Sequence, residues 1–165
     1  MSKLIIIRGN SGSGKSTLAK ALQRKFGRNT MVISQDVIRR EMLWVKDGIG
    51  TEALPLMVNL IQYGRQNSQV VILEGILDAV CYQELFESAV DAFSSNIFAY
   101  YYDLPFEETL LRHQTKPNRN DFGESDMRRW WNEKDYIGFI SEKVLTKELS
   151  LNDTVELIYR DVMDI

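Results

Sequence analysis

Gly9-Asn10-Ser11-Gly12-Ser13-Gly14-Lys15-Ser16 is the stretch that decides the fold of this chain, and it has the pattern G-x-x-x-x-G-K-S. The apolar, largely β-branched residues 4–7 precede it and predict a buried parallel strand. Residues 17–26 follow with apolar side chains at helical spacing, and Gly27 stands where a helix C-cap is expected. Together these segments predict a strand, a glycine-rich loop and a helix.

This predicted loop has the features of a phosphate site rather than of a simple glycine-rich turn. Glycines let successive N–H groups approach phosphate oxygens, and the following helix adds unpaired donors and a positive dipole end. Lys15 is expected to reach the β- and γ-phosphates, and the Ser16 hydroxyl to ligate Mg²⁺. Thr17 is either an α-phosphate contact or an ordinary first-turn residue. The residues assigned to nucleotide binding are Gly9, Asn10, Ser11, Gly12, Ser13, Gly14, Lys15, Ser16 and Thr17.

Length and composition are those of one soluble globular domain. The 165 residues are 44% hydrophobic and 26% charged, so we expect a single domain over 1–165. A net charge of −3 means that the protein has no overall positive charge with which to attract nucleic acid non-specifically. Cys81 is the single cysteine, which excludes an intrachain disulfide, and it is expected to be a buried small hydrophobe. With no apolar run of membrane-spanning length, a cytoplasmic location without membrane contact is expected.

Apolar runs alternate with helical patterns along the chain, and this alternation predicts an α/β fold with a parallel sheet. The expected strands are 4–7, 31–33, 70–73, 97–102 and 143–146. The expected helices after the first are 37–43, 52–66, 79–93, 106–113, 124–132 and 151–163, with Ser150 as an N-cap for the last. Residues 114–123 lack periodicity and are rich in turn residues, so we predict an active-site lid at about 114–132.

The glycine loop, the small size and the run Asp36-Val37-Ile38-Arg39 resemble the P-loop kinases that phosphorylate small molecules or nucleic-acid ends. Polynucleotide 5′-kinase, chloramphenicol phosphotransferase, zeta-toxin and gluconate kinase are similar in pattern. The resemblance implies a P-loop NTPase three-layer sandwich, with a five-stranded parallel sheet, helices on both faces and a small lid. It also implies that Asp36 faces the acceptor hydroxyl and that Arg39 holds an acceptor-side anion.

The position of Asp36 supports that role on physical grounds. Asp36 follows the predicted strand 31–33 and therefore lies on the same rim of the sheet as the phosphate loop. A carboxylate there can accept or orient the acceptor-hydroxyl proton during attack on the γ-phosphoryl group. Arg39 is one helical turn later and faces the same way. The alternative makes Asp36 a helix N-cap and Arg39 a solvated charge.

Glu74 ends the predicted strand 70–73 in the region of the Walker B motif. It is expected to hold a water on Mg²⁺, with Ser16 as the other metal residue, or to touch the acceptor. Many P-loop classes have aspartate at this place, so a strand-end acid that orders nearby backbone is the alternative.

Arginines of the lid region complete the expected site. Arg112 resembles the arginine that opens the lid in such kinases and stacks on adenine, although a cation also suits a helix C-terminus. Arg119, Arg128 and Arg129 are candidates to stabilise charge on the transferring group, and Arg128 is the one assigned to catalysis. Trp44, Trp130 and Trp131 either line an acceptor pocket or pack the core and lid. His113 is expected to be a helix-end polar residue.

The sequence therefore predicts an ATP- and Mg²⁺-dependent phosphotransferase that moves the γ-phosphoryl group to a hydroxyl. The expected acceptor is a small molecule, with a nucleic-acid 5′ end as a further candidate. The catalytic residues would be Lys15, Asp36, Arg39 and Arg128. A P-loop ATPase or nucleotide-dependent switch acting on a protein partner is the alternative, and a binding-only relative is a third hypothesis. The oligomeric state is left open.

Overall fold

A computed structural model describes residues 1–164 and contains one parallel sheet. The strand order across the sheet is β2-β3-β1-β4-β5. The central strands are fully covered, which explains their continuous apolar runs: Leu4 to Ile7 and Val71 to Leu73 are entirely buried. The strands are β1 (Lys3–Gly9), β2 (Thr30–Ser34), β3 (Val70–Gly75), β4 (Ile97–Tyr102) and β5 (Glu142–Leu145).

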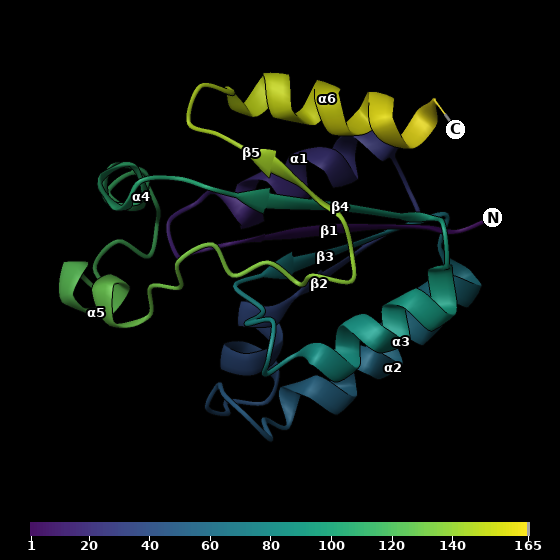
Figure 1. Ribbon diagram of the computed structural model, residues 1–165, viewed down its shortest axis with the longest axis horizontal. Helices are drawn as coiled ribbons and strands as arrows, with labels where there is room; N and C mark the ends of the chain where they lie inside the picture. The colour runs from purple at the N-terminus through teal and green to yellow at the C-terminus, as the bar shows by residue number, and fades with distance from the viewer. Residues whose placement is uncertain (165) are drawn as a thin grey trace.

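Helices cover both faces of the sheet (Figure 1). On one face, α1 (Lys15–Phe26) and α6 (Leu151–Met163) pack on alternate side chains of β1 such as Ile5 and Ile7. On the other, α2 (Ala53–Asn67) and α3 (Gln83–Phe93) pack on Leu4 and Ile6. The predicted three-layer α/β sandwich and five-stranded parallel sheet are confirmed. Within residues 1–164, no helix is long and apolar enough to cross a bilayer.

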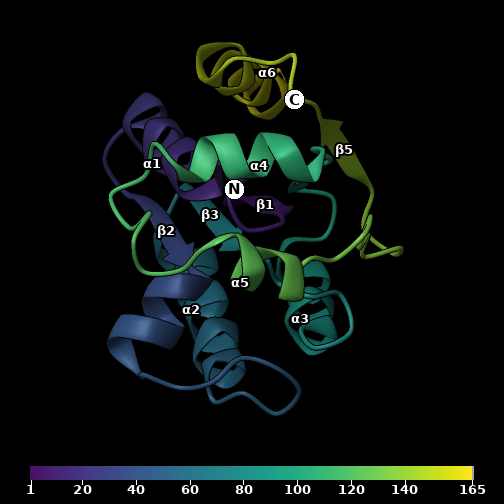
Figure 2. The same cartoon turned by 90° about the vertical axis from the view of Figure 1, so that its left-hand side faces the viewer.

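Three short helices lie beyond the carboxyl ends of the strands. They are η1 (Val37–Met42), α4 (Phe106–His113) and α5 (Glu124–Arg129). In the end-on view, α4 and α5 stand in front of the sheet edge where the strands finish (Figure 2). Parallel sheets bind ligands at this edge, so these helices surround the place where a site is expected.

The structure differs from the expected helix boundaries in three places. α3 begins at Gln83 rather than at residue 79, because the Asp78 carboxylate accepts hydrogen bonds from the amides of Val80 and Cys81 and holds a turn. The expected helix 124–132 ends at Arg129. The expected helix 37–43 is a wide π-turn, in which the Leu43 amide donates to the Ile38 carbonyl.

Arg8 is a buried charge that sequence reasoning missed. It leaves the end of β1 fully buried, and its guanidinium nitrogens lie 2.8 Å from carboxylate oxygens of Asp135 and of Glu142. It also donates two hydrogen bonds to the Leu77 carbonyl. Arg8 thus joins β1 to the β3–α3 connection, to β5 and to the segment that leaves the lid.

Replacing Arg8 by methionine is expected to lower the free energy of unfolding by about 3–5 kcal/mol, because Glu142 is left buried and unpaired. Urea unfolding measures this change. Lys25→Met, which breaks the exposed pair of Lys25 with Glu156, is the matched control and should leave the unfolding midpoint nearly unchanged. Equal midpoints for the two variants would contradict a structural role for Arg8.

Candidate active site

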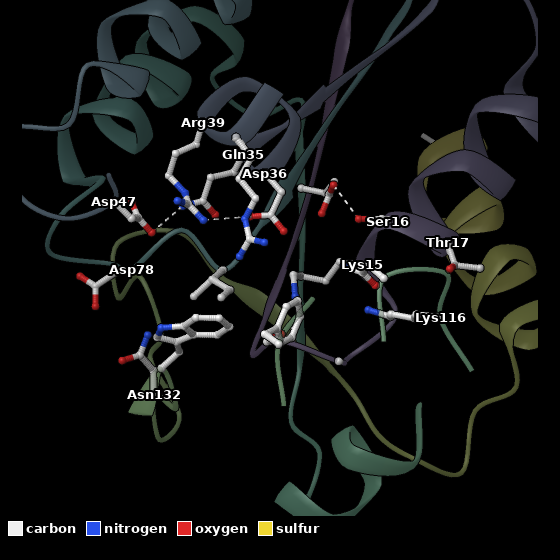
Figure 3. A pocket seen from close by; sticks show the side chains of 18 of the residues that line it. Lys15, Ser16, Thr17, Gln35, Asp36, Arg39, Asp47, Asp78, Lys116 and Asn132 are labelled. Atoms are coloured by element: carbon white, nitrogen blue, oxygen red, sulfur yellow. Dashed lines mark hydrogen bonds and ion pairs between the residues drawn. The ribbon is translucent and has the colours of Figure 1, made fainter. Parts of the chain in front are cut away.

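A cavity of about 650 Å³ opens at the carboxyl ends of the strands. The phosphate loop and α1 form one wall, η1 and the segment after it form another, and residues of the lid form a third. Figure 3 shows Lys15, Ser16, Thr17 and Lys116 at one end and Asp47, Asp78 and Asn132 at the other. Asp36 and Arg39 lie between the two ends (Figure 3). The cavity therefore has room for a phosphate end and an acceptor end.

The phosphate end is built by the loop between β1 and α1. Gly14 has φ +98°, a backbone conformation that suits glycine and turns the chain into α1. Lys15 is buried, and its Nζ donates to the Asn10 carbonyl at 2.8 Å. The Ser16 Oγ donates to Glu74 Oε1 at 2.9 Å. The structure thus brings together Lys15, Ser16 and Glu74, as their places in the sequence predicted.

The hydroxyl and carboxylate oxygens around Ser16 are of the type that binds a magnesium ion. Glu74 is buried at the end of β3 and accepts from both Ser16 and Ser34, at 2.9 and 2.6 Å. Mg²⁺ prefers oxygen ligands and commonly takes one or two from protein, with substrate phosphates supplying others. Within residues 1–164 no group of three or more His, Cys, Asp or Glu forms a self-contained metal cluster. A metal here would therefore be shared with a bound nucleotide.

Burial perturbs the Lys15 ammonium. Desolvation lowers the pKa of Lys15 from 10.5 to about 8, and the nearby Glu74 carboxylate opposes that shift. Removing the ammonium from water without a compensating anion disfavours its charged form. A nucleotide's phosphates would supply the missing negative charge, so Lys15 is poised to gain a proton as they bind.

Binding of Mg-ATP at pH 8 is expected to take up roughly half a proton per site through Lys15, because about half of Lys15 is neutral in the free protein at that pH. Affinity should be highest below pH 8 and decline above it. Calorimetry in HEPES and in Tris, whose ionisation enthalpies differ, measures the uptake. The uptake should fall in Lys15→Met, and equal heats in the two buffers for the parent protein would contradict this assignment.

Asp36 and Arg39 both reach the cavity from the start of η1. The Asp36 side chain is 60% exposed and lies 3.7 Å from Arg39 Nη2 and 3.9 Å from Arg40 Nε. Asp36 has helical dihedrals, φ −65° and ψ −41°, so it belongs to the turn instead of capping it from an extended conformation. Its carboxylate is therefore open to a ligand, with two guanidinium groups beside it.

Polar side chains outside the predicted catalytic, nucleotide-binding and metal residues line the acceptor end. Asp47 accepts from Tyr82 at 2.6 Å and from Gln35 at 3.2 Å, which fixes the segment after η1 against the sheet. Asp78 and Cys81 also line the cavity. Burial and these acids raise the pKa of the Cys81 thiol to about 11, so it stays neutral. Cys81 is half-buried on a cavity wall, as a small neutral side chain.

Lys116 is the lid cation that reaches the phosphate end. It lines the cavity, and desolvation lowers the pKa of its amine while Glu74 and Asp36 oppose that change. Arg40 approaches from the opposite wall, with its guanidinium 5.6 Å from the Phe122 ring and 5.9 Å from the Trp130 ring. Lys116 was not among the expected lid cations, because the aperiodic sequence of residues 114–123 does not indicate which way its side chains point.

The expected lid arginines lie elsewhere in the described chain. Arg128 is exposed, pairs with Glu124 at 2.8 Å and stacks 4.2 Å from the Phe106 ring, so this arrangement does not bring it to Lys15 and Asp36. Arg129 pairs with Asp126. Arg119 is also exposed and donates to the Lys116 carbonyl. A catalytic role for Arg128 stays a prediction that this conformation does not support.

Arg112 lies against the back of the phosphate loop. Its Nη1 donates to the Ser13 carbonyl at 2.7 Å, and its Nε pairs with Glu108 at 3.0 Å. The guanidinium is 5.7 Å from the Tyr102 ring. The residue therefore touches the phosphate loop through its backbone, and stacking of Arg112 on adenine stays a prediction.

The histidine and the three tryptophans have different surroundings. His113 Nε2 contacts the carbonyls of Arg119 and Phe122, so it holds the lid turn together. Trp130 lines the cavity, whereas Trp131 packs edge-on against Phe106. Trp44 is 90% exposed, so of the three tryptophans only Trp130 reaches the cavity among residues 1–164.

Comparison with known proteins identifies the family of this chain. The model of the AAA domain family matches residues 4–137, which include the phosphate loop, η1 and the lid. The chain belongs to this family. Its fold is similar to that of solved P-loop kinases. No curated protein matches the sequence.

Three solved structures illustrate the likeness of fold. A gluconokinase from Sinorhizobium meliloti is 13% identical with a TM-score of 0.65, covering 98% of this chain and 92% of its own. A tunicamycin resistance protein from Deinococcus radiodurans is 20% identical with a TM-score of 0.67, covering 99% and 96%. The APS kinase of Mycobacterium tuberculosis, in complex with AMPPNP and APS, is 18% identical with a TM-score of 0.63, covering 99% and 98%. At these identities the likeness establishes the fold alone.

Proposed function

We propose that this protein is an ATP- and Mg²⁺-dependent kinase that transfers the γ-phosphoryl group to a hydroxyl of a small molecule. One observation carries the proposal: Lys15, Ser16 and the open Asp36 carboxylate line the same cavity. A nucleic-acid 5′ end remains a second class of acceptor. The family supports nucleotide-dependent phosphoryl transfer in general, and the acceptor end of the cavity is where the substrate would be chosen.

The chain's own residues divide the work of transfer. The loop amides and Lys15 would hold the β- and γ-phosphates, while Asp36 accepts the proton of the attacking hydroxyl. Ser16 and Glu74 would hold Mg²⁺, which neutralises charge on the phosphates when it is bound. Arg39 would hold the acceptor beside Asp36. Most of the rate enhancement would come from positioning and charge stabilisation, because phosphoryl transfer needs little covalent help.

The lid has a separate part in this proposal. Lys116 lies on the cavity wall beside the phosphate loop and would neutralise charge on the transferring group. Lid closure would exclude water and limit hydrolysis of ATP.

The half-buried neutral Cys81 and the lack of any disulfide partner in the sequence agree with action in a reducing, cytoplasmic compartment.

A screen of hydroxyl compounds with Mg-ATP, read by product mass, tests the proposal. Sugars, nucleosides, antibiotics and 5′-hydroxyl oligonucleotides form its arms. A product heavier by one phosphoryl group supports the kinase and names its acceptor class. Release of inorganic phosphate at the same rate in every arm, without a phosphorylated product, would overturn it in favour of an ATPase or switch.

A further inference from the structure

The phosphate loop and the end of the lid are joined by a reciprocal pair of hydrogen bonds. Asn10 Nδ2 donates to the Asn132 carbonyl, and the Asn132 amide donates to Asn10 Oδ1, both at 2.7 Å. One side-chain amide therefore satisfies both backbone groups of a residue 122 positions away. Because Asn10 is buried, these bonds are shielded from water and hold the lid end at a fixed place on the loop.

The backbone of Asn10 is tied to the phosphate end at the same time. Its carbonyl accepts hydrogen bonds from Lys15 Nζ at 2.8 Å and from the Ser13 hydroxyl. Lys15 is also the group that a nucleotide's phosphates would attract. The bond from Lys15 to the Asn10 carbonyl is therefore one that nucleotide binding would weaken or redirect, in the same residue that holds Asn132.

The phosphate loop packs closely against α4 and α5, which leaves little room for it to move. A Cβ at Gly12 would lie 2.5 Å from the Thr109 carbonyl oxygen and 2.9 Å from Met127 Cε, so α4 and α5 press on the loop backbone. On its other side Asn132 lines the acceptor end of the cavity, and Asp135 beyond it is paired with Arg8. The Asn132 segment is thus held between the loop and the sheet.

We propose that Asn10 is a positioning residue that couples occupancy of the phosphate loop to the acceptor wall formed by the lid end. This inference rests on the proposed nucleotide binding. With the nucleotide bound, Lys15 turns to the phosphates, and Asn10 transmits the change to Asn132 through its side-chain amide. Nucleotide and acceptor then favour each other's binding, since a coupling of this kind is reciprocal.

Hydrogen exchange over residues 130–136, with and without Mg-AMPPNP, tests the coupling. In the parent protein AMPPNP is expected to slow exchange of this segment. In Asn10→Ala the free protein should exchange there about tenfold faster, because the Asn132 amide has lost its acceptor. Slowing by AMPPNP should disappear when the variant is saturated with the nucleotide, and calorimetry on each protein gives the AMPPNP concentration that saturates it.

Two further variants make the test specific. Asn120→Ala removes an exposed asparagine of the lid and should match the parent in exchange and in affinity. Asn10→Asp keeps an acceptor for the Asn132 amide but sets a carboxylate oxygen against the Asn132 carbonyl, so exchange there should also be faster than in the parent protein. Should Asn10→Ala fail to fold, the isosteric Asn10→Asp supplies the comparison.

Parent-like exchange and parent-like slowing by AMPPNP in the Asn10 variants would overturn the proposal. So would a loss of AMPPNP affinity with full slowing at saturation, because Asn10 would then only shape the loop. Absence of AMPPNP binding to the parent would instead contradict the proposed function, and the free-protein comparison would still decide whether Asn10 holds the lid end.

Discussion

Replacing Lys15 by alanine is expected to lower the rate of phosphoryl transfer by about a thousandfold, the range seen when a preorganised charge on the transferring group is removed. Lys15 is the buried cation of the phosphate loop, and its ammonium is held 2.8 Å from the Asn10 carbonyl. Its removal leaves the β- and γ-phosphates without a positive charge inside the loop. Initial rates with Mg-ATP and an acceptor found by the screen measure the loss.

The matched control is Lys25→Ala, which removes an exposed lysine from the same helix and should leave the rate unchanged. Thermal unfolding separates loss of function from loss of fold. Because burial disfavours the charged form of Lys15 and lowers its pKa to about 8, Lys15→Ala should unfold at a temperature no lower than the parent protein's. Transfer at a parent-like rate in Lys15→Ala would show that the loop does not carry the chemistry.

The sheet was predictable because its signals are local. β1 and β3 are apolar on both faces, so their runs stand out from the polar connections, and the phosphate-loop pattern fixes which strand comes first. Asp36 lies two residues after the end of β2, and Glu74 is the penultimate residue of β3, so parallel strands alone place both at one edge. The meeting of Ser16 with Glu74 follows from the same rule.

The lid side of the site could not be predicted, because its side chains are oriented by contacts far away in the sequence. Arg128 had the right charge, but Glu124 and the Phe106 ring hold it outside, while Lys116 points in. The sequence of the phosphate loop does not reveal that the Asn10 side chain binds the backbone of Asn132, which lies 122 residues away. The position of the Asp47 carboxylate likewise depends on distant residues, because Tyr82 and Gln35 donate the hydrogen bonds that hold it.

Asp36→Asn is expected to lower the rate of transfer by about a hundredfold to ten-thousandfold, which is the usual contribution of a positioned general base. Affinity for Mg-ATP should stay the same, because Asp36 lies on η1 across the cavity from the loop that grips the phosphates. The amide keeps the size of the carboxylate but cannot accept the acceptor's proton. Calorimetry with Mg-ATP and single-turnover transfer measure the two quantities separately.

The two roles considered for Asp36, general base and ion-pair partner, predict different results in this experiment. Were Asp36 only a partner for Arg39 and Arg40, at 3.7 and 3.9 Å on an exposed surface, asparagine would be nearly neutral, since exposed ion pairs contribute little. Were it the base, transfer would fall while ATP binding and thermal unfolding stayed parent-like. Asp91→Asn makes the same chemical change on the exposed side of α3 and should have no effect on either quantity. An undiminished rate in Asp36→Asn would therefore remove Asp36 from the chemistry and leave positioning by the phosphate loop and the lid as the source of catalysis.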